Sequence, residues 1–161
     1  MNIEILDIWK YLHENEVKYL TIGGFAVNFY GYNRATGDID LLIDDSLENR
    51  KRLRKAFKEI GIGDFKEIEH IEFIPGWSDF TLNYGMRLDI MTAIKGFSQG
   101  EFDELYQKSK LTYISGIPIR FIDYENLIIS KKATNRPKDQ IDISEMEKAK
   151  KWDEENLDPK A

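Results

Sequence analysis

A pair of glycines placed between a strand pattern and a helix pattern constrains this chain more than any other feature. The apolar run Tyr19–Ile22 stops at Gly23-Gly24, and helical spacing resumes from Phe25 as far as Gly31. This order predicts a strand, a glycine turn and a short helix. Free backbone N–H groups at the start of such a helix can bind an anion, whereas a glycine pair elsewhere would indicate only a turn.

Two aspartates lie in the next predicted strand, Asp38–Ile43. Alternate residues of a strand share a face, so Asp38 and Asp40 point to one side while the residue between them points into the core. Asp89 has the same setting in a later apolar run. If the two strands are neighbours, Asp89 completes a cluster of three carboxylates, which requires a bound cation or a protonated acid because like charges repel.

Carboxylate oxygens without a nearby histidine or cysteine favour hard cations such as Mg²⁺ or Mn²⁺. The alternative is an ordinary amphipathic strand whose acids face solvent, which explains most isolated Asp-Ile-Asp segments. The glycine turn, the paired acids and the distant acid together favour a metal and nucleotide site over that alternative. His13 and His70 have no partners in the sequence pattern for a zinc site or a nucleophile.

Size and charge limit the classes of function. The 161 residues, 42% of them apolar, can bury one core, so we expect a single domain over residues 1–152 and a charged tail over residues 153–161. The net charge of −6 disfavours tight binding to nucleic acid. The absence of cysteine excludes disulfides and thiolate zinc sites. No apolar run is long enough for a membrane helix or signal core, so we expect a cytoplasmic protein.

The remaining segments alternate between helical and strand patterns. Ser46 and Asp123 each precede a helical face and are expected to be N-caps. Residues 64–78 fit neither period and stay unassigned. The other predicted elements are a helix from Ile5 to about Asn15, hairpins of Phe80–Tyr84 with Arg87–Thr92 and of Leu111–Ile114 with Ile117–Ile122, and helices over Phe102–Lys108, Tyr124–Lys132 and Lys138–Trp152.

These motifs resemble the nucleotidyltransferase superfamily whose best-known member is DNA polymerase β. Its pattern is an apolar residue, Gly, Gly or Ser, a spacer, an Asp-apolar-acid triplet and a later acid between apolar residues. Ile22-Gly23-Gly24, Asp38-Ile39-Asp40 and Leu88-Asp89-Ile90 match that pattern. The surrounding sequence is similar to that of small bacterial nucleotidyltransferases related to abortive-infection toxins and of minimal nucleotidyltransferases. The residues that carry this similarity are Gly31, Arg34, Thr36, Lys131-Lys132-Ala133 and Arg136-Pro137-Lys138-Asp139.

The resemblance implies an α+β fold, in which a small mixed sheet flanked by helices forms the polymerase-β-like core and a helical segment follows it. It implies two-metal transfer of a nucleoside monophosphate from a nucleoside triphosphate to a hydroxyl group, with two Mg²⁺ or Mn²⁺ ions. It makes Asp38, Asp40 and Asp89 the catalytic residues and metal ligands. It assigns nucleotide binding to Gly23, Gly24, Arg34, Thr36, Lys131 and Lys132.

One departure from the pattern affects phosphate binding. Many catalytic relatives carry a serine where this chain has Gly24, so backbone N–H groups would have to hold the triphosphate alone. Arg34 could pair with the acids when metal is absent or touch the nucleotide. Lys131 could reach the triphosphate or extend to water at the end of its helix. Tyr30, Tyr32 and Trp77 could stack on a base, although packing is the commoner role of such residues.

Rival functions stay open at this point. The acceptor could be a small molecule or a protein, and the acidic composition counts against RNA. A different class is a nucleotide-binding or antitoxin-like regulatory module that acts through a partner protein. So short a chain has little room for an acceptor-binding domain, unless two copies share a cleft as a homodimer. A carboxylate metal site that serves hydrolysis is a third possibility.

Overall fold

Six strands form one mixed sheet within the residues that the computed structural model describes, which are 4–70, 77–82 and 85–157. The elements follow in the order α1 (Ile5–Glu14), β1 (Tyr19–Ile22), α2 (Gly23–Phe29), β2 (Asp38–Ile43), α3 (Leu47–Ile60), η1 (Lys66–Glu69), β3 (Trp77–Thr81), β4 (Arg87–Met91), η3 (Gln99–Glu101), α4 (Phe102–Lys108), β5 (Lys110–Ile114), β6 (Ile117–Phe121), α5 (Tyr124–Thr134) and α6 (Pro137–Asn156). This architecture confirms the expected α+β class.

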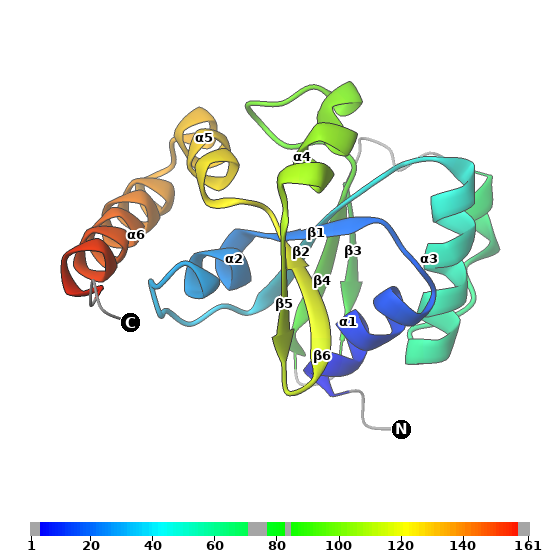
Figure 1. The fold of residues 1–161 in the computed structure, drawn as a ribbon. Helices are drawn as coiled ribbons and strands as arrows, with labels where there is room; N and C mark the ends of the chain where they lie inside the picture. Colours follow the sequence, from blue (N-terminus) through cyan, green and yellow to red (C-terminus); the bar gives the residue numbers. More distant parts are fainter. Residues whose placement is uncertain (1–3, 71–76, 83–84, 158–161) are drawn as a thin grey trace.

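The strand order across the sheet is β3-β4-β2-β1-β6-β5. β1 pairs with β2 in antiparallel orientation, whereas β2 with β4 and β1 with β6 are parallel pairs. The hairpins β3–β4 and β5–β6 add the outer strands. In Figure 1, α1 and α3 lie together on the right of the sheet, and α2, α5 and α6 gather on the left. The two acid-bearing strands β2 and β4 are thus direct neighbours near the centre of the sheet.

Helix boundaries follow the capping residues that the sequence predicts. The Ser46 hydroxyl accepts a hydrogen bond from the Asn49 backbone N–H at the start of α3, and Gly61 ends that helix with φ +91°. The Asp123 carboxylate accepts from the Asn126 backbone N–H at the start of α5, at 3.1 Å. Each cap satisfies a backbone group that the first or last turn of the helix leaves without a partner.

The core confirms the alternation read in β2. Ile39 and Leu41 are fully buried, whereas Asp38 and Asp40 are half-buried on the opposite face. Helices α1 and α3 cover the sheet with the side chains that carry their apolar stripes: Ile8, Trp9, Leu12, Leu53, Ala56, Phe57 and Ile60. The acids are therefore presented by a strand whose other face is fixed in the core.

Two elements differ from the sequence prediction by three residues or more at a boundary. The first strand of the hairpin is Trp77–Thr81 instead of Phe80–Tyr84, because its register with β4 ends at Thr81 opposite Arg87. Residues 83 and 84 of the predicted strand lie outside the described residues. Helix α6 runs past Trp152 to Asn156 and so enters the predicted tail. Those residues contain no glycine or proline, so nothing in them stops the helix.

The described helices include none that combines the length and the apolar character needed to span a membrane.

One buried hydrogen bond ties α1 to β1 and provides a test of the fold. The Trp9 indole N–H donates to the Thr21 hydroxyl at 2.9 Å, and both side chains are buried. Thr21→Val keeps the shape of the side chain but leaves the indole N–H without an acceptor. We expect it to lower the free energy of unfolding by about 1–3 kcal/mol, measured by urea denaturation.

Thr21→Ser is the matched control, because it removes a methyl group and keeps the acceptor. It should cost less than Thr21→Val. A valine variant at least as stable as the serine variant would show that the hydrogen bond contributes little to the packing of α1.

Candidate active site

The glycine turn lies directly against one of the predicted acids. Gly23 has φ +63°, a conformation that favours glycine, and a Cβ added there would overlap the Asp40 carboxylate. Gly24 follows as the second residue of α2. The turn and the acid-bearing strand therefore meet at a place where no larger residue fits.

Strand register brings the third acid to the same place. β2 and β4 are parallel neighbours, with Asp40 opposite Asp89 and Asp38 opposite Arg87. All four of these residues line a pocket of about 430 Å³. The expectation that the acid-bearing strands are adjacent is thus met.

The pocket collects most of the residues predicted from sequence. Those that line it are Gly23, Gly24, Arg34, Asp38, Asp40, Asp89 and Lys131. Lys132 is exposed, and neither it nor Thr36 is among the lining residues. Lys131, the other lysine of the pair, is buried in the pocket wall.

Four further cations line the pocket that the predicted site did not include: Arg87, Lys95, Arg136 and Lys138. Arg87 could have been found, because it lies two residues before Asp89 on one strand and therefore shares its face. Arg136 and Lys138 lie at the start of α6, and the sequence indicates only a helix start there. Their position depends on how α6 docks.

Burial and neighbouring negative charge raise the pKa values of two of the acids. Burial raises the pKa of Asp40 to about 6, and the charges of Asp89 and Asp38 add to this, while Lys138 and the Gly24 backbone N–H oppose it. Burial also raises the pKa of Asp89, against the lowering effect of Arg87. The Asp89 Oδ1 atom is buried and has no hydrogen-bond partner. A buried carboxylate oxygen without a partner is costly, so this atom favours a proton or a cation.

Arg87 bridges two of the acids. Its Nε lies 3.0 Å from Asp38 Oδ1, and its Nη2 lies 3.7 Å from Asp89 Oδ2. The arginine is about half exposed, whereas the Asp89 side chain is 8% exposed. Of the two roles left open for Arg34, pairing with these acids is therefore not what the structure has, because Arg87 contacts them instead.

The donor set fits a divalent metal in its chemistry. Three carboxylates line one pocket, and the orphaned oxygen of Asp89 is the kind of hard ligand that Mg²⁺ and Mn²⁺ prefer. Across the described residues, however, no group of three or more His, Cys, Asp or Glu side chains is drawn together tightly enough to form a ligand set. The carboxylates would have to converge, and Arg87 would have to release Asp38 and Asp89.

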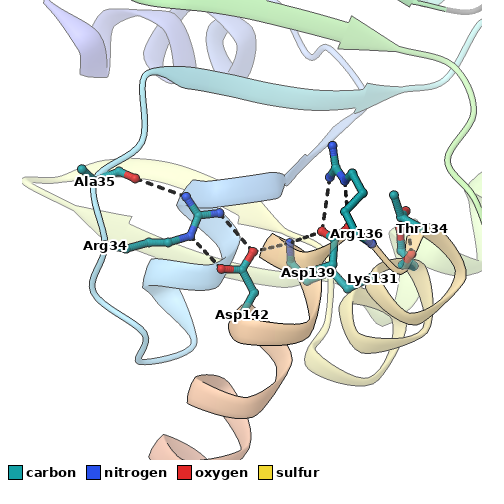
Figure 2. Close-up of polar contacts among 8 residues, drawn as sticks. Arg34, Ala35, Lys131, Thr134, Arg136, Asp139 and Asp142 are labelled. Atoms are coloured by element: carbon teal, nitrogen blue, oxygen red, sulfur yellow. Dashed lines mark hydrogen bonds and ion pairs between the residues drawn. The ribbon is translucent and has the colours of Figure 1, made fainter.

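Arg34 and Lys131 belong to a second set of ion pairs (Figure 2). Arg34 pairs with Asp142 through Nε at 2.8 Å and Nη2 at 3.1 Å. Lys131 Nζ lies 2.7 Å from Asp142 and 3.4 Å from Asp139. The expected alternative in which Lys131 extends to water is not what the structure has, because its side chain is only 7% exposed.

Thr36 explains why this chain has Gly24 where many catalytic relatives carry a serine. A Cβ on Gly24 would lie 2.5 Å from Thr36 Oγ1 and 2.7 Å from Thr36 Cβ. A serine cannot occupy that position unless Thr36 moves. The Thr36 hydroxyl donates to the Asp38 carbonyl at 3.2 Å, so it links the loop to the start of β2.

The aromatic residues proposed for base stacking have other contacts. The Tyr30 hydroxyl donates to the Ile122 carbonyl at 2.7 Å, and its ring packs on Tyr124. Tyr32 packs against the core, and neither tyrosine lines the pocket. The Trp77 side chain lies outside the described part of the chain. Packing is thus the observed role of Tyr30 and Tyr32.

Comparison with known proteins identifies the class of this site. A family model described as "Nucleotidyltransferase of unknown function (DUF6036)" matches residues 4–161. The chain belongs to this family. It is therefore an enzyme of the nucleotidyltransferase class, as the sequence motifs indicate, and its acceptor is unknown. No curated protein matches the chain significantly.

Two solved structures share the fold of this nucleotidyltransferase. The lincosamide antibiotic adenylyltransferase LnuA, bound to lincomycin, is similar with a TM-score of 0.58 and 16% identity, over 91% of this chain and 98% of that chain. A candidate nucleotidyltransferase from Thermotoga maritima has a TM-score of 0.57 and 18% identity, over 92% of this chain and 89% of that chain. At such identities the likeness concerns the fold, and it confirms the polymerase-β-like core.

The strained acid pair makes a stability prediction for the metal-free nucleotidyltransferase. A folded-state pKa of about 6 for Asp40 means that its ionisation opposes folding, with a cost that is absent below about pH 4 and complete above about pH 6. Asp40→Asn should therefore raise the free energy of unfolding at pH 7.5 by about 1–3 kcal/mol, and should change it little at pH 4. Denaturation in EDTA at both pH values measures this.

Asp38→Asn is the control for Asp40→Asn, because it also removes one negative charge from the site. Asp38 is 37% exposed and pairs with Arg87, so its loss should leave stability unchanged or reduce it by less than about 1 kcal/mol. Equal stabilisation by both substitutions would mean that relief of general negative charge, and not the burial of Asp40, is responsible.

Proposed function

We propose that this nucleotidyltransferase transfers a nucleoside monophosphate from a nucleoside triphosphate to a hydroxyl acceptor, in a reaction that depends on divalent metal. Asp38, Asp40 and Asp89 carry the reaction. The observation that supports this most directly is the parallel register of β2 with β4, in which Asp40 faces Asp89 beside the glycine turn. Three acids and an anion-binding turn in one pocket are what phosphoryl chemistry needs.

The three aspartates would hold two Mg²⁺ or Mn²⁺ ions, which when bound supply positive charge at the reacting phosphate and acidify the acceptor hydroxyl. Asp89 accepts the proton of that hydroxyl, and its buried Oδ1 is the free position for it. The acceptor oxygen forms a bond to the α-phosphorus while the bond from that phosphorus to the β-phosphate oxygen breaks. Pyrophosphate leaves with the electron pair of the broken bond.

The glycine turn beside Asp40 and the nearby cations bind the triphosphate. The backbone N–H groups of the Gly23-Gly24 turn hold phosphate oxygens, helped by the fixed charge of Arg34 and Lys131. Lys138 also lines this pocket and is close enough to Asp40 to lower its pKa. Thr36 packs against Gly24 and so supports the turn. Lys132 is exposed and, of the predicted residues, has the least structural support for a contact with the nucleotide.

The acceptor is a small molecule or a protein side chain. LnuA, a lincosamide antibiotic adenylyltransferase, gives a precedent for a small acceptor on this fold. The net charge of −6 counts against the end of an RNA chain. A small acceptor would enter beside Asp89, where the pocket wall also contains the apolar side chains of Met91 and Ile94.

A nucleotide-binding regulatory module of the antitoxin-like kind is the second candidate. The observation that favours it is the contact of Arg87 with Asp38 and Asp89, because an arginine that stayed in place would keep these acids from metal. Such a module would bind nucleotide and a partner protein without transfer. The two candidates predict different fates for the nucleotide.

A transfer experiment with matched labels separates them. The protein is incubated with Mn²⁺, a cell lysate and each nucleoside triphosphate in turn, radiolabelled at the α- or the γ-phosphorus. We expect an acceptor to take up the α-label and not the γ-label, and EDTA or Asp89→Asn to abolish uptake.

Asp64→Asn is the control variant, since Asp64 pairs with Arg54 and lies outside the pocket lining. It should label the acceptor as the unchanged protein does. Uptake of the γ-label, or full activity of Asp89→Asn, would overturn the proposed reaction.

A further inference from the structure

One buried carboxylate connects three separate parts of the pocket wall. Asp142 lies on α6 with a side chain that is 1% exposed. Its Oδ1 accepts from Arg34 Nε at 2.8 Å, and its Oδ2 accepts from Arg34 Nη2 at 3.1 Å and from Lys131 Nζ at 2.7 Å. Figure 2 shows the two cations meeting at Asp142 from the loop before β2 and from α5.

One of the two cations held by Asp142, Arg34, lies against the glycine turn. Arg34 and Lys131 line the pocket, whereas Asp142 itself does not. Arg34 Nη1 lies 3.4 Å from the position that a Cβ on Gly24 would take, so the guanidinium group packs over the turn. Asp142 therefore does not contact a bound anion itself and acts on it either through its charge or through the groups that it holds.

Asp139, the other acid of the network, has a different role. It accepts hydrogen bonds from Arg136, whose side chain is 64% exposed, and forms the longer of the two contacts to Lys131. Burial raises the pKa of Asp139, but the hydrogen bonds from Arg136 and the charge of Lys131 hold it below the usual range. Asp139 thus stabilises the start of α6, while Asp142 fixes two partly buried cations at once.

The Arg34 contact has the geometry of a strong pair. Two parallel N–H donors meet two carboxylate oxygens, which fixes the orientation of the guanidinium plane as well as its distance. The third donor, Lys131, comes from a different helix, so one carboxylate sets the spacing between two cations. Residues 108 positions apart in sequence are held in this way, and a packing role alone would not require both cations to line a pocket.

We propose that Asp142 is a positioning residue of the triphosphate site, which holds Arg34 and Lys131 in the arrangement that grips the phosphates beside the glycine turn. This inference rests on the proposed function, because it assumes that the pocket binds a triphosphate. It adds a determinant of affinity that lies outside the pocket, on the C-terminal helix.

The sign of the effect distinguishes positioning from simple charge. Asp142→Asn removes a negative charge near an anion site, so electrostatics alone would tighten the binding of a polyphosphate. Loss of the arrangement would weaken it, because the two cations would no longer be held in place. The two explanations therefore predict opposite changes.

The test uses inorganic tripolyphosphate with Mg²⁺ as the probe, so that neither the base nor the acceptor needs to be known. Isothermal titration calorimetry is done well below the unfolding temperature of each variant, which separates affinity from stability. We expect Asp142→Asn to bind the probe about tenfold more weakly than the unchanged protein. Unchanged or tighter binding overturns the inference.

Asp64→Asn is the matched control, since it removes the same charge from an ion pair with Arg54 whose residues do not line this pocket. It should bind the probe as the unchanged protein does. A comparable loss in the control would assign the effect to net charge or general loosening and would also overturn the inference.

Arg34→Lys provides a second reading if Asp142→Asn does not fold. Lysine keeps the charge but cannot make the two parallel hydrogen bonds, so we expect a similar weakening of tripolyphosphate binding. Undiminished affinity in this variant would show that the fixed orientation of Arg34 is not needed. If the unchanged protein itself does not bind tripolyphosphate, the proposed function is wrong. If the unchanged protein and the variants bind it equally well, only the inference about Asp142 is wrong.

Discussion

The parallel pairing of β2 with β4 sets Asp40 beside Asp89. The raised pKa values of these two carboxyls and the ion pairs of Arg87 with the acids follow from burial and from the negative charge gathered there. Both strands are held by the core on their other face, so the acids cannot move apart without breaking the sheet. Burial and like charge then raise the pKa of both carboxyls. An enzyme can keep such an arrangement because the same acids are stabilised when cations bind between them.

The protein supplies its own counter-charges on both sides of the pocket. Arg87 contacts Asp38 and Asp89 on the acidic side, and Asp142 is paired with Arg34 and Lys131 on the basic side. Each set pairs opposite charges within the protein, although Asp40 and Asp89 keep raised pKa values. These ion pairs offset part of the cost of burying the charges.

Local features of the site could be predicted from sequence, because they depend on neighbours along the chain. The turn at Gly23, the alternation of Asp38 with Asp40, and the caps at Ser46 and Asp123 follow from local geometry. The adjacency of Asp89 could be stated only as a condition, since the register between β2 and β4 joins strands that are far apart in sequence.

What escaped prediction depends on tertiary docking. Arg34 and Asp142 are 108 positions apart, and no periodicity in either segment indicates that they meet. The sequence left pairing with the acids open as one of two roles for Arg34, yet Arg87 contacts these acids because its strand places it opposite Asp38. The sequence predicts a strand at Phe80–Tyr84, whereas the strand lies at Trp77–Thr81. Its pairing with β4, and not its own alternation of apolar residues, sets where it ends.

The paired charges also bear on how the site would receive its substrate. A nucleoside triphosphate with two divalent ions is close to neutral, so its entry changes the total charge of the pocket little while it exchanges partners. The aspartates would leave Arg87 for cations of higher charge, and Arg34 and Lys131 would keep Asp142 while they gain phosphate oxygens. Arg87 is about half exposed and can move into solvent, whereas Asp142 and Lys131 are buried and cannot. Under the proposed function, one side of the pocket would change on binding while the other stays fixed, as a preorganised phosphate site requires.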